Sequence, residues 1–181
     1  MNIKENADKI LYEFGLYKIV EKYGKVHLIG SYKMDIMDLN DLDISIEKSN
    51  QSFEEIFEMA NEINNKFKPY RFEGMHSKKD NCYFYGLEME INNDYWNIDI
   101  WFREKVEIIK NENYCDEIVQ LIKMNPKFRN TIKEIKNELI KINLYGINKS
   151  PKNHYHSKEI YDAVLIDGIL DFKEFMEKFP K

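Results

Sequence analysis

A change of hydrophobic period near residue 110 constrains the fold more than any other feature of this sequence. Before it, apolar and polar residues alternate in several segments, which is typical of strands that bury one face. After it, apolar residues recur every three or four positions, which indicates amphipathic helices. The alternating segments are 41–47, 82–91 and 95–102, and the helical ones are 112–124, 127–144, 157–167 and 171–179.

This order of elements predicts an α+β fold. Helical spacing over residues 3–22 and 52–67 adds helices to the strand-rich part. We expect a sheet domain over residues 1–110 and a helical part over residues 111–181 that packs on it. The turn signal Asn92-Asn93-Asp94 joins the last two strand segments as a hairpin.

Composition excludes several classes of protein. The 181 residues carry a net charge of −5, which disfavours nucleic acid as a partner because that affinity comes largely from neutralised phosphates. Two cysteines without a C-x-x-C pair exclude a disulfide scaffold and a zinc ribbon, and suit a reducing compartment. No stretch resembles a signal peptide or a membrane span. The predicted location is therefore the cytoplasm, with no membrane partner.

Three aspartates are the candidate metal ligands. Asp41 and Asp43 alternate with apolar residues on one strand, so both carboxylates leave the same face. Asp99 lies in the apolar stretch Trp96–Phe102, where a carboxylate is costly to bury unless a positive charge meets it. We predict that the two strands are neighbours in one sheet. Three converging carboxylates repel one another, and Mg²⁺ relieves that repulsion through hard oxygen ligands.

A second candidate group precedes the acid pair. Gly30 and Ser31 follow the short apolar run 26–29, so a phosphate can approach the backbone there and Ser31 adds a hydroxyl donor. Lys33 follows closely and can offset phosphate charge. One short hairpin is thus predicted to carry both a phosphate-binding turn and a metal-binding acid pair.

Together these residues resemble the signature of the nucleotidyltransferase superfamily related to DNA polymerase β. The resemblance rests on Leu28-Ile29-Gly30-Ser31, a nine-residue spacer, Asp41-Leu42-Asp43-Ile44, and Asp99 as the third acid. It covers roughly residues 25–103 and implies a small mixed sheet flanked by helices. It further implies catalytic Asp41, Asp43 and Asp99 that hold two Mg²⁺ ions, with Gly30, Ser31 and Lys33 on the phosphates of an NTP such as ATP. The loop 32–34 departs from the Arg and small residues that many members carry.

The resemblance implies transfer of a nucleoside monophosphate from an NTP to a hydroxyl of a small-molecule acceptor, as in aminoglycoside and lincosamide nucleotidyltransferases. Transfer to a protein or RNA partner is an alternative, and so is a non-catalytic member that binds a nucleotide or a partner protein. The residues alone also allow a solvated acidic loop, which accounts for Asp35 and Asp38 but not for Asp99. The same loop could bind calcium, but it lacks the central Gly and the terminal Glu of an EF-hand.

The acceptor contacts are expected in the segment 153–162. Tyr155, Lys158 and Tyr161 are the candidates, and the alternative is that these helices only cover apolar sheet surface. Trp101 is the best candidate for stacking on a base, because it shares a strand face with Asp99. His154 and His156 lack a third ligand at a suitable spacing and favour a structural or surface role.

Overall fold

The chain forms two compact units, Met1–Cys115 and Asp116–Lys181. The computed structural model describes residues 2–48, 50, 52–78, 81–146 and 154–181. Among these, no helix has the length and apolar character needed to cross a lipid bilayer. The division at residue 110 and the packing of the helical part on the sheet stay predictions.

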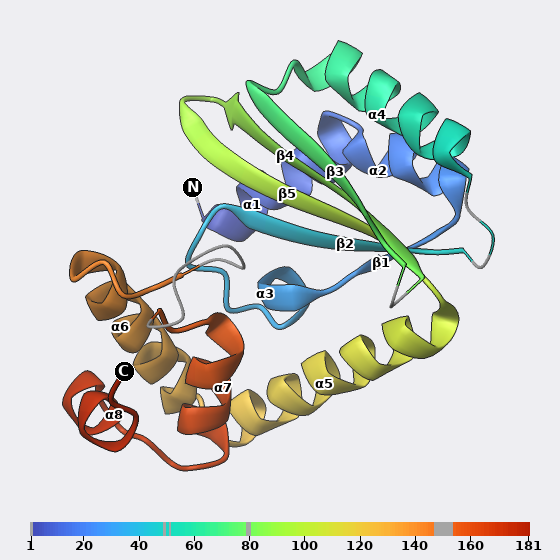
Figure 1. The fold of residues 1–181 in the computed structure, drawn as a ribbon. Coiled ribbons are helices and arrows are strands. Elements are labelled where there is room, and N and C mark those ends of the chain that lie inside the picture. The colour runs from blue at the N-terminus through green and yellow to red at the C-terminus, as the bar shows by residue number, and fades with distance from the viewer. Residues whose placement is uncertain (1, 49, 51, 79–80, 147–153) are drawn as a thin grey trace. The chain divides into compact units, whose positions relative to one another are not determined.

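The first unit is built on a five-stranded mixed sheet, which confirms the predicted fold class (Figure 1). The strand order is β1-β2-β5-β4-β3, and only β2 and β5 run parallel. The sheet therefore places the two acid-bearing strands side by side at its centre. The strands are β1 (Lys25–Leu28), β2 (Asp41–Glu47), β3 (Arg71–Ser77), β4 (Cys82–Ile91) and β5 (Asp94–Arg103).

The β4–β5 hairpin follows from its turn residues. Ile91 pairs with Asp94, so Asn92 and Asn93 form a two-residue loop. Both have positive φ, of 55° and 66°, which a tight hairpin of this length requires and which asparagine tolerates. The hairpin fixes the register of β5 and therefore the position of Asp99.

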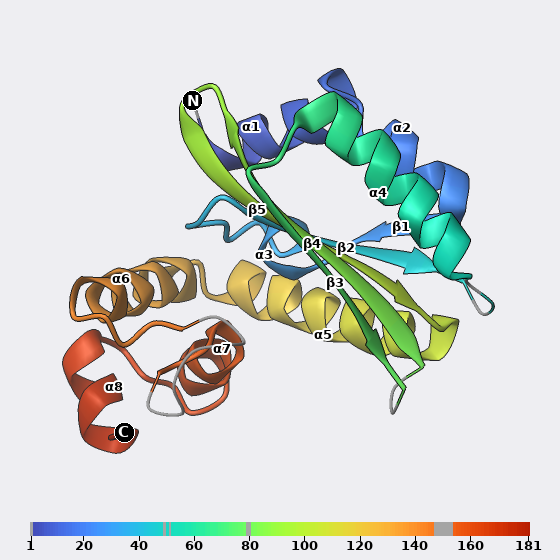
Figure 2. The same ribbon diagram turned by 45° about the horizontal axis from the view of Figure 1, so that its top comes forward.

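Helices cover one face of the sheet, as Figures 1 and 2 both show. Leu42, Ile44 and Ile46 of β2 point into this layer and are fully buried with the apolar residues of β4 and β5. Burying one face this completely leaves the alternate residues, Asp41 and Asp43, on the other. The helices are α1 (Ile3–Asp8), η1 (Lys9–Glu13), α2 (Leu16–Val20), η2 (Glu21–Tyr23) and α4 (Phe53–Phe67).

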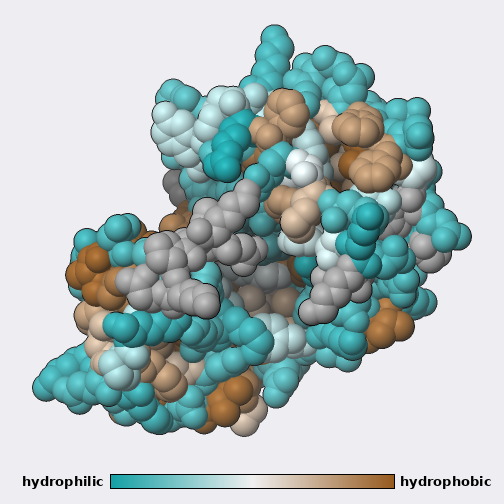
Figure 3. Space-filling model, viewed as in Figure 1, coloured by the Kyte–Doolittle hydropathy of each residue, from teal (hydrophilic) through white to brown (hydrophobic). Residues whose placement is uncertain are grey.

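Aromatic side chains gather on the surface over α4 and β3 (Figure 3). Phe53 contacts Tyr83 edge to face, at 5.1 Å between ring centroids, and His76 stacks on Tyr83 at 4.1 Å. Phe57 and Phe72 stay more than half exposed. β3 is an edge strand, so this surface continues to an unpaired strand edge within the described residues.

The second unit is helical. Its core is built around Phe175, which contacts Tyr155 with ring centroids 5.0 Å apart. The chain enters this unit through α5 (Lys105–Met124). This helix begins seven residues before the predicted start at 112, because helical spacing begins directly after β5. The other helices are α6 (Lys127–Lys141), α7 (Ser157–Leu165) and α8 (Phe172–Lys178).

Candidate active site

The two acid-bearing strands are neighbours, and their aspartates lie on the face of the sheet opposite the helical layer. Asp43 of β2 lies directly opposite Asp99 of β5, and Asp41 lies opposite Asn97. This register confirms the prediction that the two strands are neighbours. All three aspartates are partly buried, so their charges interact through a medium less polar than bulk water.

The turn after β1 lies against the acid pair. Gly30 has φ +63°, in the left-handed region, and begins the short helix α3 (Gly30–Lys33). A Cβ atom at this position would lie 2.0 Å from Asp43 Oδ2. The carboxylate of Asp43 thus occupies the space that the Cβ atom of any residue other than glycine would need at position 30. The turn and the carboxylate therefore depend on each other.

Substituting Gly30 by alanine is therefore expected to lower the free energy of unfolding by about 2 kcal/mol and to displace the Asp43 carboxylate. Urea denaturation measures the stability. The matched control is Gly168→Ala, because Gly168 has a similar φ of +72° and no atom within 4 Å of its Cβ position. If both variants lose equal stability, the contact with Asp43 contributes nothing.

Asn97 connects two of the aspartates. Its Nδ2 atom donates to Asp41 Oδ1 at 2.7 Å and lies 3.3 Å from Asp99 Oδ1. A donor between two carboxylates reduces their repulsion, so Asn97 positions both acids. Asn97 is two residues from Asp99 on β5 and so shares its face, but only the strand register revealed this bridging position.

Asp99 is held in an environment that disfavours its charge. Burial, then the nearby charge of Asp41, raises its pKa from 3.8 to about 6, while the hydrogen bond from Asn97 opposes this shift. Glu73 raises the pKa further and Arg103 lowers it. A carboxyl group that titrates near neutral pH in a cluster of acids is a common mark of a functional site.

Glu73 was missed by the sequence reasoning. It lies on β3 opposite Gly86 of β4, which in turn lies opposite Asp99. Glu73, Gly86 and Asp99 line a small cavity of about 30 Å³ together with Arg71, Leu87, Glu88 and Asn97. Only the pairing of three strands brings Glu73 there, because the three residues are far apart in sequence and share no motif.

Lys33 has a contact that the sequence did not predict. Its Nζ donates to the carbonyl oxygen of Glu112 on α5 at 3.4 Å. The Glu112 side chain contacts His27 Nδ1 at 2.9 Å, and Glu47 contacts the other ring nitrogen at 3.2 Å. This group of contacts joins β1, β2 and the first half of α5 beside the turn.

Several solved structures are similar to this chain. A GLD-2–GLD-3 poly(A) polymerase complex matches with TM-score 0.66 at 9% identity, over 98% of this chain and 58% of that one. The Cid1 poly(U) polymerase bound to MgATP matches with TM-score 0.66 at 14% identity, over 90% and 49%. The polymerase core of TRAMP, an RNA surveillance complex, matches with TM-score 0.61 at 14% identity, over 87% and 48%.

The chain has the nucleotidyltransferase fold. This confirms the fold that the sequence resemblance implied. The chain spans about half the length of the polymerases it matches. No family model and no curated protein matches the sequence.

The nucleotidyltransferase fold implies Mg²⁺, and the residues fit it in part. Three carboxylates at adjacent strand positions supply the hard oxygen ligands that Mg²⁺ prefers. As the side chains stand, no group of three or more His, Cys, Asp or Glu residues in the described chain is arranged to hold a metal ion. The arrangement explains this, since Asn97 stands between Asp41 and Asp99, while Asp43 lies against Gly30.

Trp101 of the nucleotidyltransferase sheet is partly exposed on the acid face. Its ring lies 4.6 Å from that of Phe84, and Arg103 lies over it at 4.3 Å. The predicted stacking surface is thus shared with a guanidinium group, which also approaches Asp99 closely enough to lower its pKa.

The predicted acceptor contacts are wrong for both tyrosines. Tyr155 is 1% exposed and donates from its hydroxyl to the carbonyl oxygen of Phe179. Tyr161 is 4% exposed and accepts from the buried Lys136 at 2.8 Å. Their amphipathic rings are used as core residues with satisfied hydroxyls. Lys158 is exposed but pairs with Asp162 on its own helix at 2.7 Å.

Of the two histidines in this segment, His156 has the structural role that the sequence favoured. His156 is the N-cap residue of α7, and its backbone N–H donates to Glu159 Oε2 at 2.8 Å. The expected acceptor segment began at Asn153, which lies outside the described residues.

Proposed function

We propose that this protein transfers a nucleoside monophosphate from an NTP to a hydroxyl group of an acceptor, with Mg²⁺ bound by Asp41, Asp43 and Asp99. The observation that carries the proposal is that the turn at Gly30 lies directly against the aspartates. Gly30 leaves room for the Asp43 carboxylate, and Asp43 lies opposite Asp99 on the parallel neighbour. Phosphate groups and metal ions are needed together in such a transfer, and these two elements lie together here.

Each residue has a role that follows from its position. Gly30 and Ser31 present backbone N–H groups and a hydroxyl to the phosphates, and Lys33 adds a positive charge beside them. Mg²⁺ held by Asp41, Asp43 and Asp99 would neutralise the phosphates and lower the pKa of the attacking hydroxyl. Asn97 orients Asp41 and Asp99 through Nδ2. Asp99 would receive the hydroxyl proton at Oδ2, the oxygen that Asn97 does not contact.

RNA is the acceptor that we favour. The solved structures with this fold include poly(A) and poly(U) polymerases and a cytoplasmic RNA terminal U-transferase. A small molecule is the second candidate, because a chain of net charge −5 attracts a cationic acceptor more readily than a polyanion. The two differ in product size, so one assay separates them.

The test is transfer of label from each of the four NTPs, labelled at the α-phosphate, in the presence of Mg²⁺. We expect a ladder of extended products on a single-stranded RNA with a free 3′-hydroxyl, and none on the same RNA with a 3′-deoxy end. Label on an aminoglycoside or lincosamide panel alone would favour the second candidate. Binding of an NTP without label on any acceptor would contradict transfer and favour the non-catalytic alternative.

A further inference from the structure

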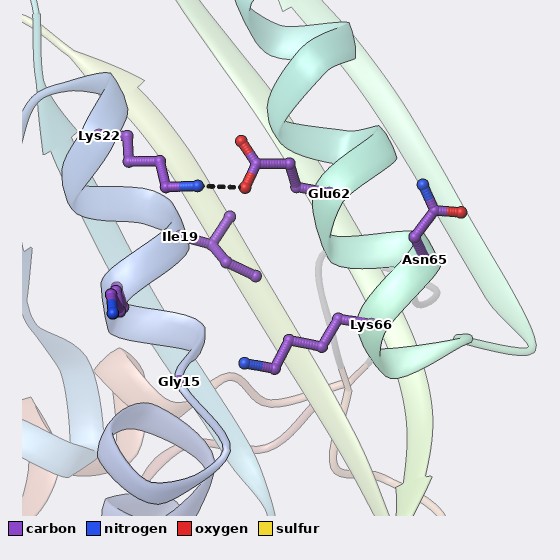
Figure 4. A pocket seen from close by; sticks show the side chains of 7 residues that line it. Gly15, Ile19, Lys22, Glu62, Asn65 and Lys66 are labelled. Atoms are coloured by element: carbon purple, nitrogen blue, oxygen red, sulfur yellow. Dashed lines mark hydrogen bonds and ion pairs between the residues drawn. The ribbon is translucent and has the colours of Figure 1, made fainter.

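A cleft between α2 and α4 is lined by three lysines (Figure 4). It has a volume of about 500 Å³, within the range of small-molecule sites. It lies in the helical layer, so the sheet separates it from the aspartates described above. The lining residues are Gly15, Lys18, Ile19, Lys22, Glu62, Asn65 and Lys66.

The charge of this cleft is opposite to that of the whole chain. Lys18, Lys22 and Lys66 contribute three positive charges, and Glu62 is the one carboxylate of the lining. Glu62 is already engaged, because Lys22 donates to one oxygen and the Tyr23 hydroxyl donates to the other at 2.7 Å. These contacts lower the pKa of Glu62, so it stays ionised and holds Lys22 in place.

The two remaining lysines carry the excess positive charge. Lys18 and Lys66 are exposed, and neither makes an ion pair with a carboxylate among the residues that the structure describes. The acidic residues Glu55 and Glu58 lie earlier on α4 and act on Tyr23, and neither lines the cleft. Like charges that line one cleft repel one another, and an anion of two or more charges relieves that repulsion.

The backbone leaves the cleft open. Gly15 is buried with φ +79°, and a Cβ there would lie 2.8 Å from Lys66 Nζ. Figure 4 shows Lys66 extending from α4 toward Gly15 across the space between the helices. The ammonium group of Lys66 therefore lies close to Gly15, the residue that precedes α2.

We propose that this cleft binds phosphate groups, in the form of adjacent phosphates of an RNA backbone or of a free polyphosphate. Lys18 and Lys66 contact the phosphate oxygens, and Lys22, positioned by Glu62, supplies the third donor. Ammonium groups bind phosphate as point charges and need no fixed geometry, which suits exposed lysines on two helices. The binding does not depend on nucleotide transfer, since the cleft and the aspartates lie on opposite faces of the sheet.

The test uses inorganic pyrophosphate and a short single-stranded oligouridylate, each titrated into the full chain with EDTA present. Chemical shifts of backbone amides are followed by NMR, and the chain has only seven glycines, so the Gly15 amide is a tractable reporter. We expect Gly15 to shift with saturation. The double variant K18Q/K66Q is expected to bind at least about tenfold more weakly, since each charged hydrogen bond lost costs binding free energy.

The matched control is K110Q/K173Q, which removes two exposed lysines that lie elsewhere. It is expected to bind as the unmodified chain does. For the oligonucleotide, the slope of log affinity against log salt is expected to fall by about 1.4 in K18Q/K66Q, because two phosphate contacts are lost.

Each outcome decides the proposal. Loss with the oligonucleotide alone identifies an RNA backbone as the ligand, and loss with pyrophosphate alone identifies a free polyphosphate. Equal affinity of K18Q/K66Q and K110Q/K173Q for both probes would overturn the proposal, as would pyrophosphate or RNA binding that leaves the Gly15 amide unmoved. An inactive chain that still binds both probes here would contradict the proposed transfer and leave the phosphate cleft standing.

Discussion

Replacing Asp43 by asparagine is expected to reduce nucleotide transfer by at least about 10³-fold while the fold stays intact. Asp43 is the acid that both faces Asp99 and fills the space at Gly30, so its carboxylate belongs to the metal site and to the turn at once. Asparagine keeps the shape and removes the charge that binds Mg²⁺. Transfer of α-labelled nucleotide to RNA measures the loss.

The matched control is Asp94→Asn, because Asp94 lies on the same strand as Asp99 but is exposed at the hairpin. It is expected to keep full activity. The circular dichroism melting curve of Asp43→Asn should lie at or above that of the unmodified protein in EDTA, because one of the repelling charges is gone. Full transfer by Asp43→Asn would remove this residue from the mechanism.

Much of this fold could be predicted from period and turn residues. Alternation over 41–47, 82–91 and 95–102 indicated which side chains share a face, and Asn92-Asn93 indicated the hairpin between β4 and β5. Asp99 stood out because a carboxylate in an apolar strand requires a reason. These signals depend on residues close together in the chain, so they can be recognised in a single sequence.

The parts that the sequence did not predict depend on pairing between distant segments. Glu73 affects the pKa of Asp99 only because β3, β4 and β5 align at one level of the sheet, and no motif encodes that register. The prediction that Tyr155 and Tyr161 contact the acceptor was wrong for another reason. A tyrosine suits both a polar cleft and a core with a partner for its hydroxyl, so its sequence position does not distinguish the two.

The pH dependence of stability gives a second, independent test of the acid cluster. The pKa of Asp99 is about 6 in the folded protein and 3.8 as the ordinary value for the unfolded chain. A carboxyl group whose folded pKa is raised favours folding when it is protonated, and this contribution is lost as the pH rises through about 6. At pH 8 the ionised Asp99 is therefore expected to cost about 2–3 kcal/mol of unfolding free energy relative to pH 4.

The variant Asp99→Asn removes that cost. In EDTA, its free energy of unfolding in urea is expected to match that of the unmodified protein near pH 4 and to exceed it by about 2 kcal/mol at pH 8. Asp94→Asn serves again as the control, and its difference from the unmodified protein should not grow between these pH values. Parallel curves for Asp99→Asn and the unmodified protein would mean that neither burial nor the charge of Asp41 raises the pKa of Asp99 in the folded protein.

Addition of Mg²⁺ extends this measurement to the proposed metal site. A ligand that binds only the folded protein stabilises it according to its concentration and affinity, so Mg²⁺ should raise the stability of the unmodified protein at pH 8. It should raise that of Asp99→Asn much less, because one of the three carboxylates is missing. The stability advantage of the variant is then expected to shrink as Mg²⁺ is added. An advantage that stays constant would show that ionised Asp99 destabilises the folded protein but that Mg²⁺ does not relieve this cost.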